Sequence, residues 1–329
     1  MNRTEVVVTG MGMVTPVGTS ATEVHAAMCE GRSGLSLPPA GHQVGTALEV
    51  GAFGPPIEAA SVLPATEARV VDRYIVMALR AAADALADAG LQVGRDVDPH
   101  RVAVILSGTG GLATLEAQVV LRTAKGRLGV SPYLLPGMLP NMGAARIAIK
   151  YGIRGYVSAS GTACAAGGQA IGEGLRLLRA GEADVVVAGC SEAPLFPTLA
   201  DAGVSTGDIG YLNAHGTSTK LGDLAEALAI RTLFGDTPPP VSSTKAVTGH
   251  MLGASGVVES AVAIHALRRG VLPPTHNLDD PDPECDLDHV RKGPRMAAID
   301  HVISNSFGFG GHNVSVVYGH PSTRRTHLS

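Results

Sequence analysis

Short apolar runs typical of β-strands alternate along this chain with longer segments of helical periodicity. Most of the apolar runs are bounded by glycine, which marks the turns between elements. Alternating strands and helices predict an α/β fold with mainly parallel strand pairing. The predicted strands are Glu5–Thr9, Val102–Leu106, Tyr156–Ser160, Ala183–Ala188, Ile209–Ala214, Val241–Ser243, His301–Asn305 and Asn313–Tyr318.

Three segments between these runs carry apolar residues at helical spacing and a glycine just after the last turn. They are Arg73–Ala89, Ala165–Ala180 and Ala254–Arg269. The third ends in two arginines, which complement the negative end of the helix dipole. Two further segments are weakly patterned: Gly34–Pro64 is expected to be loop or cap, and Pro321–Ser329 is expected to be a frayed tail.

The composition suits helices packed on a sheet. The chain has 329 residues, of which 45% are hydrophobic but only 3% aromatic, so the core is expected to consist of Ala, Val, Leu and Ile. Strand, glycine turn and helix follow one another in both parts of the chain. A boundary near Pro197–Ile209 therefore predicts an N-terminal half, residues 1–200, and a C-terminal half, residues 201–329.

Charge and cysteine usage exclude several classes of function. The formal charge is −4 and no basic block stands out except Arg324-Arg325, so neither nucleic acid nor an anionic membrane surface is an expected partner. The four cysteines form no CxxC pair, so neither a zinc site nor a disulfide framework is expected, and the cytoplasm is the simplest location. No window approaches the uncharged run of about 20 residues that a membrane-spanning helix needs.

Cys164 is the strongest candidate for a reactive side chain. It lies where the predicted strand Tyr156–Ser160 breaks into a small-residue turn and enters the predicted helix Ala165–Ala180. At a helix N-terminus, the unsatisfied backbone N–H groups and the helix dipole stabilise a thiolate, which is a nucleophile. For the other three cysteines an inert place in the core is the more common outcome.

Two histidines and a lysine follow strand-like runs in the second part of the chain. His215 comes directly after one predicted strand, and His250 follows Lys245 by five residues in a turn of small residues. Taken alone, His215 is explained about equally well as a polar turn residue, and Lys245 would ordinarily be a surface charge. Coincidence is a poor explanation for all three together with Cys164.

Longer motifs surround these four residues, and together they resemble the β-ketoacyl-acyl carrier protein synthases of the elongating Cys-His-His type (KAS I/II). The resemblance covers nearly the whole chain, with its motifs in the family's order. The motifs are Gly-Thr-Ala-Cys-Ala-Ala-Gly at 161–167, Asn-Ala-His-Gly-Thr-Ser-Thr at 213–219, Ser-Thr-Lys at 243–245 with Thr-Gly-His at 248–250, Asn-Ser-Phe-Gly-Phe-Gly-Gly-His-Asn at 305–313, Val-Val-Val-Thr-Gly-Met-Gly at 6–12, and the pairs Pro273-Pro274 and Asn277-Leu278.

This resemblance implies a thiolase-like α/β fold with two related halves in a layered α-β-α-β-α arrangement and a site between the halves. It implies an acyltransferase, a 3-oxoacyl-[acyl-carrier-protein] synthase of fatty-acid or polyketide biosynthesis. The implied partner is an acyl carrier protein, whose phosphopantetheine carries the acyl and malonyl thioesters, so that no metal or other cofactor is needed. A homodimer, or a heterodimer with a related ketosynthase chain, is expected.

In the implied mechanism, Cys164 takes an acyl chain from the carrier protein. The backbone N–H groups of Cys164 and Phe309 form the oxyanion hole for this step, and Phe309 is also expected to gate the acyl pocket. His215 and His250 hydrogen-bond the malonyl thioester carbonyl and stabilise the enolate that decarboxylation produces. That carbanion attacks the acyl group on Cys164, while Lys245 fixes the environment of the histidines.

Further residues take supporting roles by the same resemblance. Glu226 stands in the helix after His215 and is a candidate partner of Lys245. Thr217 and Thr219 match the residues that bind the pantetheine arm, and Phe307 is a candidate substrate-binding residue.

The chain departs from the family pattern between Cys164 and His215, which are only 51 positions apart. The family normally has a much longer stretch there, including a core strand and helix. Missing core strands would leave sheet edges uncovered. Residues missing from the sequence, a naturally shortened paralogue and a wrong gene model all remain as explanations, and Cα–Cα steps of about 3.8 Å from Phe196 to Ile209 would exclude the first.

Other interpretations remain beside the synthase. The main alternative is a catalytically impaired partner subunit resembling a chain-length factor, although such a subunit needs neither Cys164 nor the two histidines. A thiolase-like degradative enzyme would carry a second catalytic cysteine in the closing glycine-rich segment, where none occurs after Cys285. Gly10-x-Gly12 and Gly108-x-Gly110 do not complete a dinucleotide-binding fingerprint and are interpreted as tight strand exits.

Overall fold

The computed structural model describes residues 5–36, 51–52, 54–191, 206–308 and 312–320. They divide into two compact units, each built from separate stretches of chain. The predicted boundary at residue 200 and the predicted tail Pro321–Ser329 lie outside the described residues. The first unit consists of Met1–Val14, Pro56–Pro194 and Leu252–Ala254, and the second of Thr15–Pro55, Leu195–Met251 and Ser255–Ser329.

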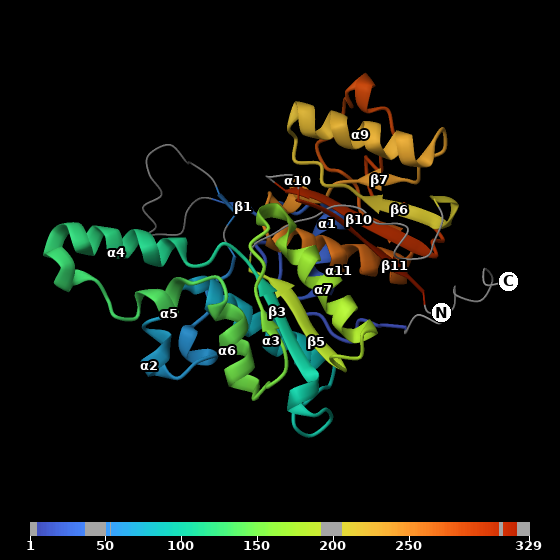
Figure 1. The fold of residues 1–329 in the computed structure, drawn as a ribbon. Helices are drawn as coiled ribbons and strands as arrows, with labels where there is room; N and C mark the ends of the chain where they lie inside the picture. The colour runs from blue at the N-terminus through green and yellow to red at the C-terminus, as the bar shows by residue number, and fades with distance from the viewer. Residues whose placement is uncertain (1–4, 37–50, 53, 192–205, 309–311, 321–329) are drawn as a thin grey trace. The chain divides into compact units, whose positions relative to one another are not determined.

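A three-stranded parallel sheet of order β4-β3-β5 forms the centre of the first unit (Figure 1). The middle strand β3 (Val102–Ser107) pairs briefly with β4 (Val157–Ser158) and along its whole length with β5 (Val185–Cys190). The prediction of strands in these three places is confirmed. Because β3 carries apolar residues at almost every position and is buried throughout, it has the sequence of a strand covered on both faces.

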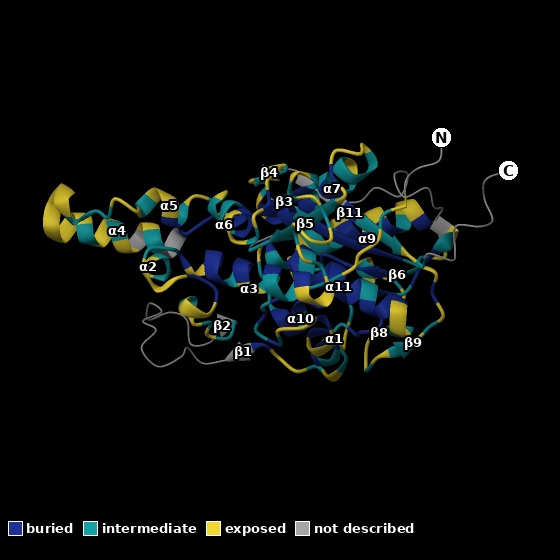
Figure 2. Cartoon of the chain, turned by 90° about the horizontal axis from the view of Figure 1, so that it is seen from below, coloured by how far each residue is buried: buried dark blue, intermediate teal, exposed yellow. Residues whose placement is uncertain are grey.

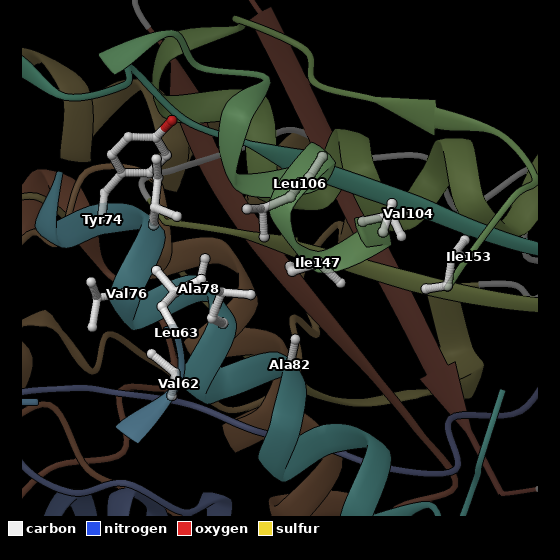
Figure 3. Close-up of a cluster of buried hydrophobic side chains, with 14 of the residues drawn as sticks. Val62, Leu63, Tyr74, Val76, Ala78, Ala82, Val104, Leu106, Ile147 and Ile153 are labelled. Carbon is white, nitrogen blue, oxygen red and sulfur yellow. The ribbon is translucent and has the colours of Figure 1, made fainter. Parts of the chain in front are cut away.

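Helices cover both faces of this sheet. On one face, α3 (Arg73–Asp88) and α6 (Met142–Tyr151) pack with β3 in a cluster of buried side chains (Figure 3). On the other face, α7 (Ala166–Arg179) packs against β3 and β5. The remaining elements of the unit are η1 (Ala59–Ser61), α2 (Ala65–Ala68), η2 (Pro99–Arg101), α4 (Leu112–Lys125), η3 (Gly126–Gly129), α5 (Leu134–Met138) and η4 (Ala163–Ala165).

The predicted strand Glu5–Thr9 does not form, so this prediction was wrong. Val7 and Val8 are 59% and 56% exposed, and no strand within the described part of the chain pairs with them. Strands need a neighbour to satisfy their backbone groups, which an apolar sequence alone does not supply. The glycines that follow have a packing role, because a Cβ at Gly10 or Gly12 would overlap the backbone of α3.

Asp72 joins three helices of the first unit, two through its buried carboxylate and one through its backbone N–H. Its Oδ1 accepts the backbone N–H of Tyr74 at 3.1 Å and so caps α3, while Oδ2 accepts the N–H of Thr114 at 3.0 Å in the first turn of α4. Its own N–H donates to the carbonyl of Gly137 in α5 at 3.2 Å. The side chain therefore satisfies two helix N-termini at once.

Replacing Asp72 with alanine is expected to lower the free energy of unfolding by about 2 kcal/mol, because two helix caps are lost together. Asp72→Asn should retain the cap on α3 and lose the one on α4, since an amide presents one acceptor oxygen. Urea unfolding measures both effects. Asp98→Ala is the matched control, because Asp98 caps only an exposed 3-10 turn, and an equal loss in that variant would contradict the double role of Asp72.

The second unit is built on a four-stranded sheet of order β11-β10-β6-β7. The strands β6 (Ile209–Asn213), β7 (Val241–Ser242) and β10 (His301–Gly308) run parallel, and β11 (His312–Gly319) closes one edge in the antiparallel direction. The four predicted strands of this region are confirmed. Short strands β1 (Leu35–Ser36) with β2 (Gly51–Ala52) and β8 (Val271–Leu272) with β9 (Arg295–Met296) form two small antiparallel pairs.

Helix α11 (Ala254–Arg269) supplies much of the core of the second unit. It is buried along most of its length, as Figure 2 shows, and packs with Tyr211 and Val302 of the sheet. None of the helices within the described residues combines the length and the apolar character needed to cross a membrane. The other elements of this unit are α1 (Ala21–Glu30), η5 (Thr206–Asp208), α9 (Lys220–Phe234), α10 (Lys245–Thr248) and η6 (Pro283–Cys285).

Candidate functional site

The predicted site residues divide between the two units. Cys164 belongs to the first unit, whereas His215, Lys245 and His250 belong to the second. Phe309, the predicted second donor of the oxyanion hole, lies outside the described residues.

Cys164 lies in the turn η4 that leads directly into α7, as the sequence predicts. The thiol side chain is buried, and the N–H of Ala165 donates to the carbonyl of Thr162 at 2.7 Å, which tightens the turn. Ala163 takes a left-handed backbone conformation with φ of 47°, which is uncommon for a residue with a Cβ. The sharp reversal places Cys164 at the N-terminal end of the helix, where N–H groups are free of intrahelical partners.

The chain leading to this turn is tied to the neighbouring strand. Ser160 and Ser107 share a hydrogen bond between their hydroxyls at 2.8 Å, and the N–H of Ser160 donates to the Ser107 hydroxyl at 3.1 Å. Ser107 ends β3, and Ser160 stands four residues before Cys164. The carboxyl end of the sheet thus fixes where the thiol-bearing turn begins.

His215 follows β6 and is held through its backbone by Glu226. One carboxylate oxygen of Glu226 accepts the N–H of His215 at 3.0 Å, and the other accepts the N–H of Gly216 at 2.9 Å. Gly216 has φ of 42°, a left-handed conformation that glycine adopts at little cost. Glu226, on the first turns of α9, therefore sets the path of the chain at His215.

The ring of His215 meets two other rings of the site. His250 lies edge-on to it with centroids 5.4 Å apart, and Phe307 of β10 lies edge-on at 5.2 Å. Burial, with Lys245 and His250 nearby, holds the pKa of His215 well below its usual range, so the ring is neutral near pH 7. Its Nδ1 is buried and has no hydrogen-bond partner within the residues described.

His250 is also neutral near pH 7. Burial and the charge of Lys245 lower the pKa of His250 to about 4. Its Nδ1 lies 3.3 Å from the hydroxyl of Ser255, which itself accepts the N–H of Met251 at 3.0 Å. When the Ser255 hydroxyl donates to Nδ1, Nε2 of His250 carries the proton and acts as a hydrogen-bond donor.

Lys245 forms a buried ion pair with Glu259 of α11. Its Nζ lies 2.5 Å from Oε1 of Glu259, and Oε2 of the same carboxylate accepts the hydroxyl of Ser306 at 3.1 Å. Burial raises the pKa of Glu259, and Lys245 and Ser306 oppose that rise. The positive charge beside the histidines is thus balanced by a carboxylate that is buried with it.

Glu226, the partner suggested for Lys245 by the sequence, interacts with the lysine only electrostatically. Its side-chain neighbour is Asn305 of β10, whose Nδ2 donates to Oε1 at 3.5 Å, and Asn305 in turn accepts the hydroxyl of Ser315. Burial raises the pKa of Glu226 to about 7 against the hydrogen bonds that favour its charged form. Glu226 therefore titrates near neutral pH.

Three polar residues of this site were missed by the sequence analysis: Glu259, Asn305 and Ser306. Glu259 gave a usable signal, because it is the single acidic residue of the helix Ala254–Arg269 and lies within its mainly apolar first three turns. Asn305 and Ser306 belong to the motif at 305–313 and are buried in β10. Only the folded structure shows that Asn305 donates to Glu226 and that Ser306 donates to Glu259.

The predicted pantetheine-binding threonines lie together at the start of α9. Their hydroxyls are 3.1 Å apart, with Thr217 half-buried and Thr219 exposed.

Over the described ranges there is no group of three or more His, Cys, Asp or Glu side chains arranged to hold a metal ion.

The titration of Glu226 predicts a measurable pH dependence of stability. Its folded pKa of about 7 lies above the ordinary 4.5, so its stabilising effect is complete below pH 4.5 and is lost as the pH rises through 7. In Glu226→Gln this loss is removed. Relative to the native chain, the unfolding free energy of the variant should therefore rise by about 2 kcal/mol between pH 5 and pH 7.

Urea titrations at several pH values measure this difference. If the amide changes stability by the same amount at every pH, the change in unfolding free energy with pH is unaffected. His250→Gln is the opposite control: its folded pKa is lowered to about 4, so the native histidine loses stability as the pH falls from about 6.5 to 4. This second variant should gain relative to the native chain on acidification. Parallel pH curves for Glu226→Gln and the native chain would refute the buried titration.

Comparisons with known proteins agree with the motifs. The family model of the beta-ketoacyl synthase N-terminal domain matches residues 3–209, and that of the C-terminal domain matches residues 194–279. The two matches meet within the segment between Cys164 and His215 that is short for the family.

Curated relatives match almost end to end. The chain is 30% identical to 3-oxoacyl-[acyl-carrier-protein] synthase 2 of Synechocystis sp. over 410 residues, covering 97% of this chain and 98% of the relative. It is 30% identical to the protein of the same name from Coxiella burnetii over 412 residues, covering 96% and 99%. Both alignments are longer than the 329 residues of this chain, so the relatives contain residues without a counterpart here.

Solved structures share the fold. A beta-ketoacyl synthase from Burkholderia phymatum superposes with a TM-score of 0.86 at 26% identity, covering 97% of this chain and 99% of that one. The ishigamide ketosynthase/chain length factor gives 0.88 at 24% identity, covering 96% and 99%. The prediction of a thiolase-like α/β fold is thus confirmed, and on the evidence of both domain models the chain belongs to the beta-ketoacyl synthase family.

Proposed function

We propose that this protein is a 3-oxoacyl-[acyl-carrier-protein] synthase that works through Cys164. The observation that carries the proposal is the pair of neutral imidazoles of His215, which is buried, and His250, which is solvent-accessible, with the charge of Lys245 beside them. Such a group can donate hydrogen bonds to an oxyanion without giving up a proton. Its relatives are named as synthases of this kind.

The first step is transfer of an acyl group to Cys164. The thiol of Cys164 loses its proton, and the thiolate attacks the carbonyl carbon of an acyl thioester on the carrier protein. The C–S bond to phosphopantetheine breaks, and its sulfur leaves as a thiolate that takes up the proton lost by Cys164. The turn geometry supports this role, because the N-terminal end of α7 offers N–H groups to the developing oxyanion. The N–H of Phe309 is proposed as a second donor.

The second step is decarboxylative condensation. A malonyl thioester loses CO₂, and the electron pair of the broken C–C bond moves into an enolate whose oxygen is held by the Nε2–H groups of His215 and His250. The enolate carbon then attacks the acyl carbonyl, the bond to Cys164 breaks, and a 3-oxoacyl thioester remains on the carrier protein. Lys245 strengthens both donors by its positive field, since the charge lowers the pKa of each ring.

Other assignments follow with the same proposal. Thr217 and Thr219 bind the pantetheine arm, Phe307 contacts substrate beside His215, and Glu226 positions the His215 turn. The halves 1–200 and 201–329 each contribute part of the site, and the chain assembles as a homodimer or with a related ketosynthase chain. The cytoplasmic location stays a prediction.

Intact-mass measurement after incubation with an acyl-carrier protein tests the nucleophile. The native chain should gain the mass of the acyl group, and Cys164→Ala should not. Cys29→Ala is the matched control, because Cys29 is a half-buried free thiol outside the proposed chemistry. An adduct that survives Cys164→Ala would refute the role of this cysteine.

The same measurement separates the enzyme from the alternative of a non-catalytic partner subunit. Solved ketosynthases in complex with a chain length factor resemble this chain in fold. A partner subunit should take no acyl group and form no 3-oxoacyl product from malonyl thioester. Absence of both with the native chain would overturn the synthase proposal.

A further inference from the structure

Ser107 is the last residue of β3 and faces α7, the helix that begins just after Cys164. Leu106, the residue before it, packs in the buried cluster with α3 and α6. Because side chains alternate between the two faces of a strand, Ser107 points to the opposite face, which α7 covers. Ser107 is only 2% exposed, so its hydroxyl depends on hydrogen-bond partners within the fold.

The Ser107 hydroxyl holds Ser160 through two hydrogen bonds. The N–H of Ser160 donates to the hydroxyl oxygen of Ser107 at 3.1 Å, and the two hydroxyls lie 2.8 Å apart. Ser160 stands four residues before Cys164, in the chain that leads from β4 into the turn η4. One side chain of β3 therefore holds both the backbone and the side chain of the segment that leads to the thiol.

Ser107 is itself fixed by β5 on the other side of β3. Its carbonyl accepts the N–H of Ser191 at 3.1 Å and the thiol of Cys190 at 2.9 Å. The strand pairing of β4 with β3, by contrast, ends at Ser158. The Ser107 hydroxyl is thus a fixed acceptor that extends the connection with the sheet by two residues, from Ser158 to Ser160.

We propose that Ser107 is a positioning residue for Cys164. By holding Ser160, its hydroxyl sets where the turn η4 begins, and so where the thiol lies relative to the N-terminal end of α7. Ser107 acts through Ser160 and the turn and does not touch the acyl group. The inference rests on the proposed function, in which Cys164 is the nucleophile.

The turn passes a displacement of Ser160 on to the thiol because it is short and tight. Ala163 has a left-handed backbone with φ of 47°, and the N–H of Ala165 donates to the carbonyl of Thr162 at 2.7 Å. An attacking atom misplaced by about 1 Å can slow a reaction by about 10²-fold. Loss of the Ser107 hydroxyl should therefore lower the rate of acyl transfer and leave the binding of the acyl donor almost unchanged.

Three alanine variants separate this role from a general loss of packing. Ser107→Ala removes both hydrogen bonds to Ser160. Ser160→Ala removes the contact between the hydroxyls but keeps the bond from its backbone N–H to Ser107. Ser158→Ala is the matched control, because Ser158 is a half-buried serine of the same run, two residues before Ser160.

Single-turnover acylation of Cys164, followed by intact mass at increasing concentrations of an acyl-carrier protein, gives the maximal rate and the half-saturating concentration separately. Ser107→Ala should lower the maximal rate by about tenfold or more and leave the half-saturating concentration within about twofold. Ser160→Ala should lose less than about threefold, and Ser158→Ala should match the native chain. A native maximal rate in Ser107→Ala, or a loss confined to the half-saturating concentration, would overturn the proposal.

Hydrogen exchange at the Ser160 amide tests the placement without any chemistry at Cys164. The native chain and Ser160→Ala should exchange slowly there, and Ser107→Ala at least about tenfold faster, because the amide has lost its acceptor. Fast exchange in the native chain would overturn the proposal whatever the stability of the variants, and so would equal exchange in Ser107→Ala. If the native chain takes no acyl group, the proposed function fails, and this exchange still decides whether Ser107 holds the turn.

Discussion

Replacing His250 with alanine is expected to slow decarboxylation of a malonyl thioester by about 10²–10³-fold, because one of two preorganised donors to the enolate oxygen is lost. His250 is suited to this role because burial and Lys245 lower its pKa to about 4. Its ring therefore stabilises the enolate through a hydrogen bond and does not protonate it. Release of CO₂ in single-turnover experiments measures the step.

Acylation of Cys164 provides the internal control for this variant. The proposed role of His250 lies in the second step, so the acyl adduct should form on His250→Ala at a rate close to that of the native chain. Ser255→Ala removes the hydroxyl that contacts Nδ1 of His250 at 3.3 Å, and should give a smaller loss of decarboxylation. Full decarboxylation by His250→Ala would contradict the proposed donor role.

The strands and helices of the cores could be predicted because their patterns are local. Runs such as Val102–Leu106 and the helix at Arg73–Ala89 are apolar, periodic and ended by glycine, so their own sequence determines the element. Glu5–Thr9 has an equally good apolar pattern and forms no strand. A strand depends on a neighbour that local sequence does not reveal.

In the site, too, the residues within short sequence motifs could be predicted, whereas their partners from other parts of the chain could not. Cys164, His215 and Lys245 stand in short motifs, and the resemblance of those motifs located them. Glu259 lies 14 residues from Lys245, on α11 where Lys245 begins α10, and the two side chains meet only in the folded chain. A buried acid in an apolar helix signals that a partner exists, but only the tertiary structure identifies it.

The ion pair between Lys245 and Glu259 leads to the largest expected effect on stability. Both side chains are almost fully buried, so Glu259→Ala leaves an ammonium group without its counter-charge and should lower the free energy of unfolding by about 3–5 kcal/mol. Urea unfolding at pH 7 measures the loss. Glu259→Gln keeps the shape and an acceptor for Ser306, and should lie between the native chain and the alanine variant.

The double variant Lys245→Met, Glu259→Leu separates the cost of a lone charge from the value of the pair. Replacing both partners with apolar side chains of similar size removes the unpaired ammonium, so stability should return to within about 1 kcal/mol of the native chain. Decarboxylation should stay low, because the positive charge beside His215 and His250 is gone. A chain restored in stability but not in activity would show that the buried pair is maintained for catalysis. A double variant as unstable as Glu259→Ala would instead place the stabilising role in the packing of these two side chains.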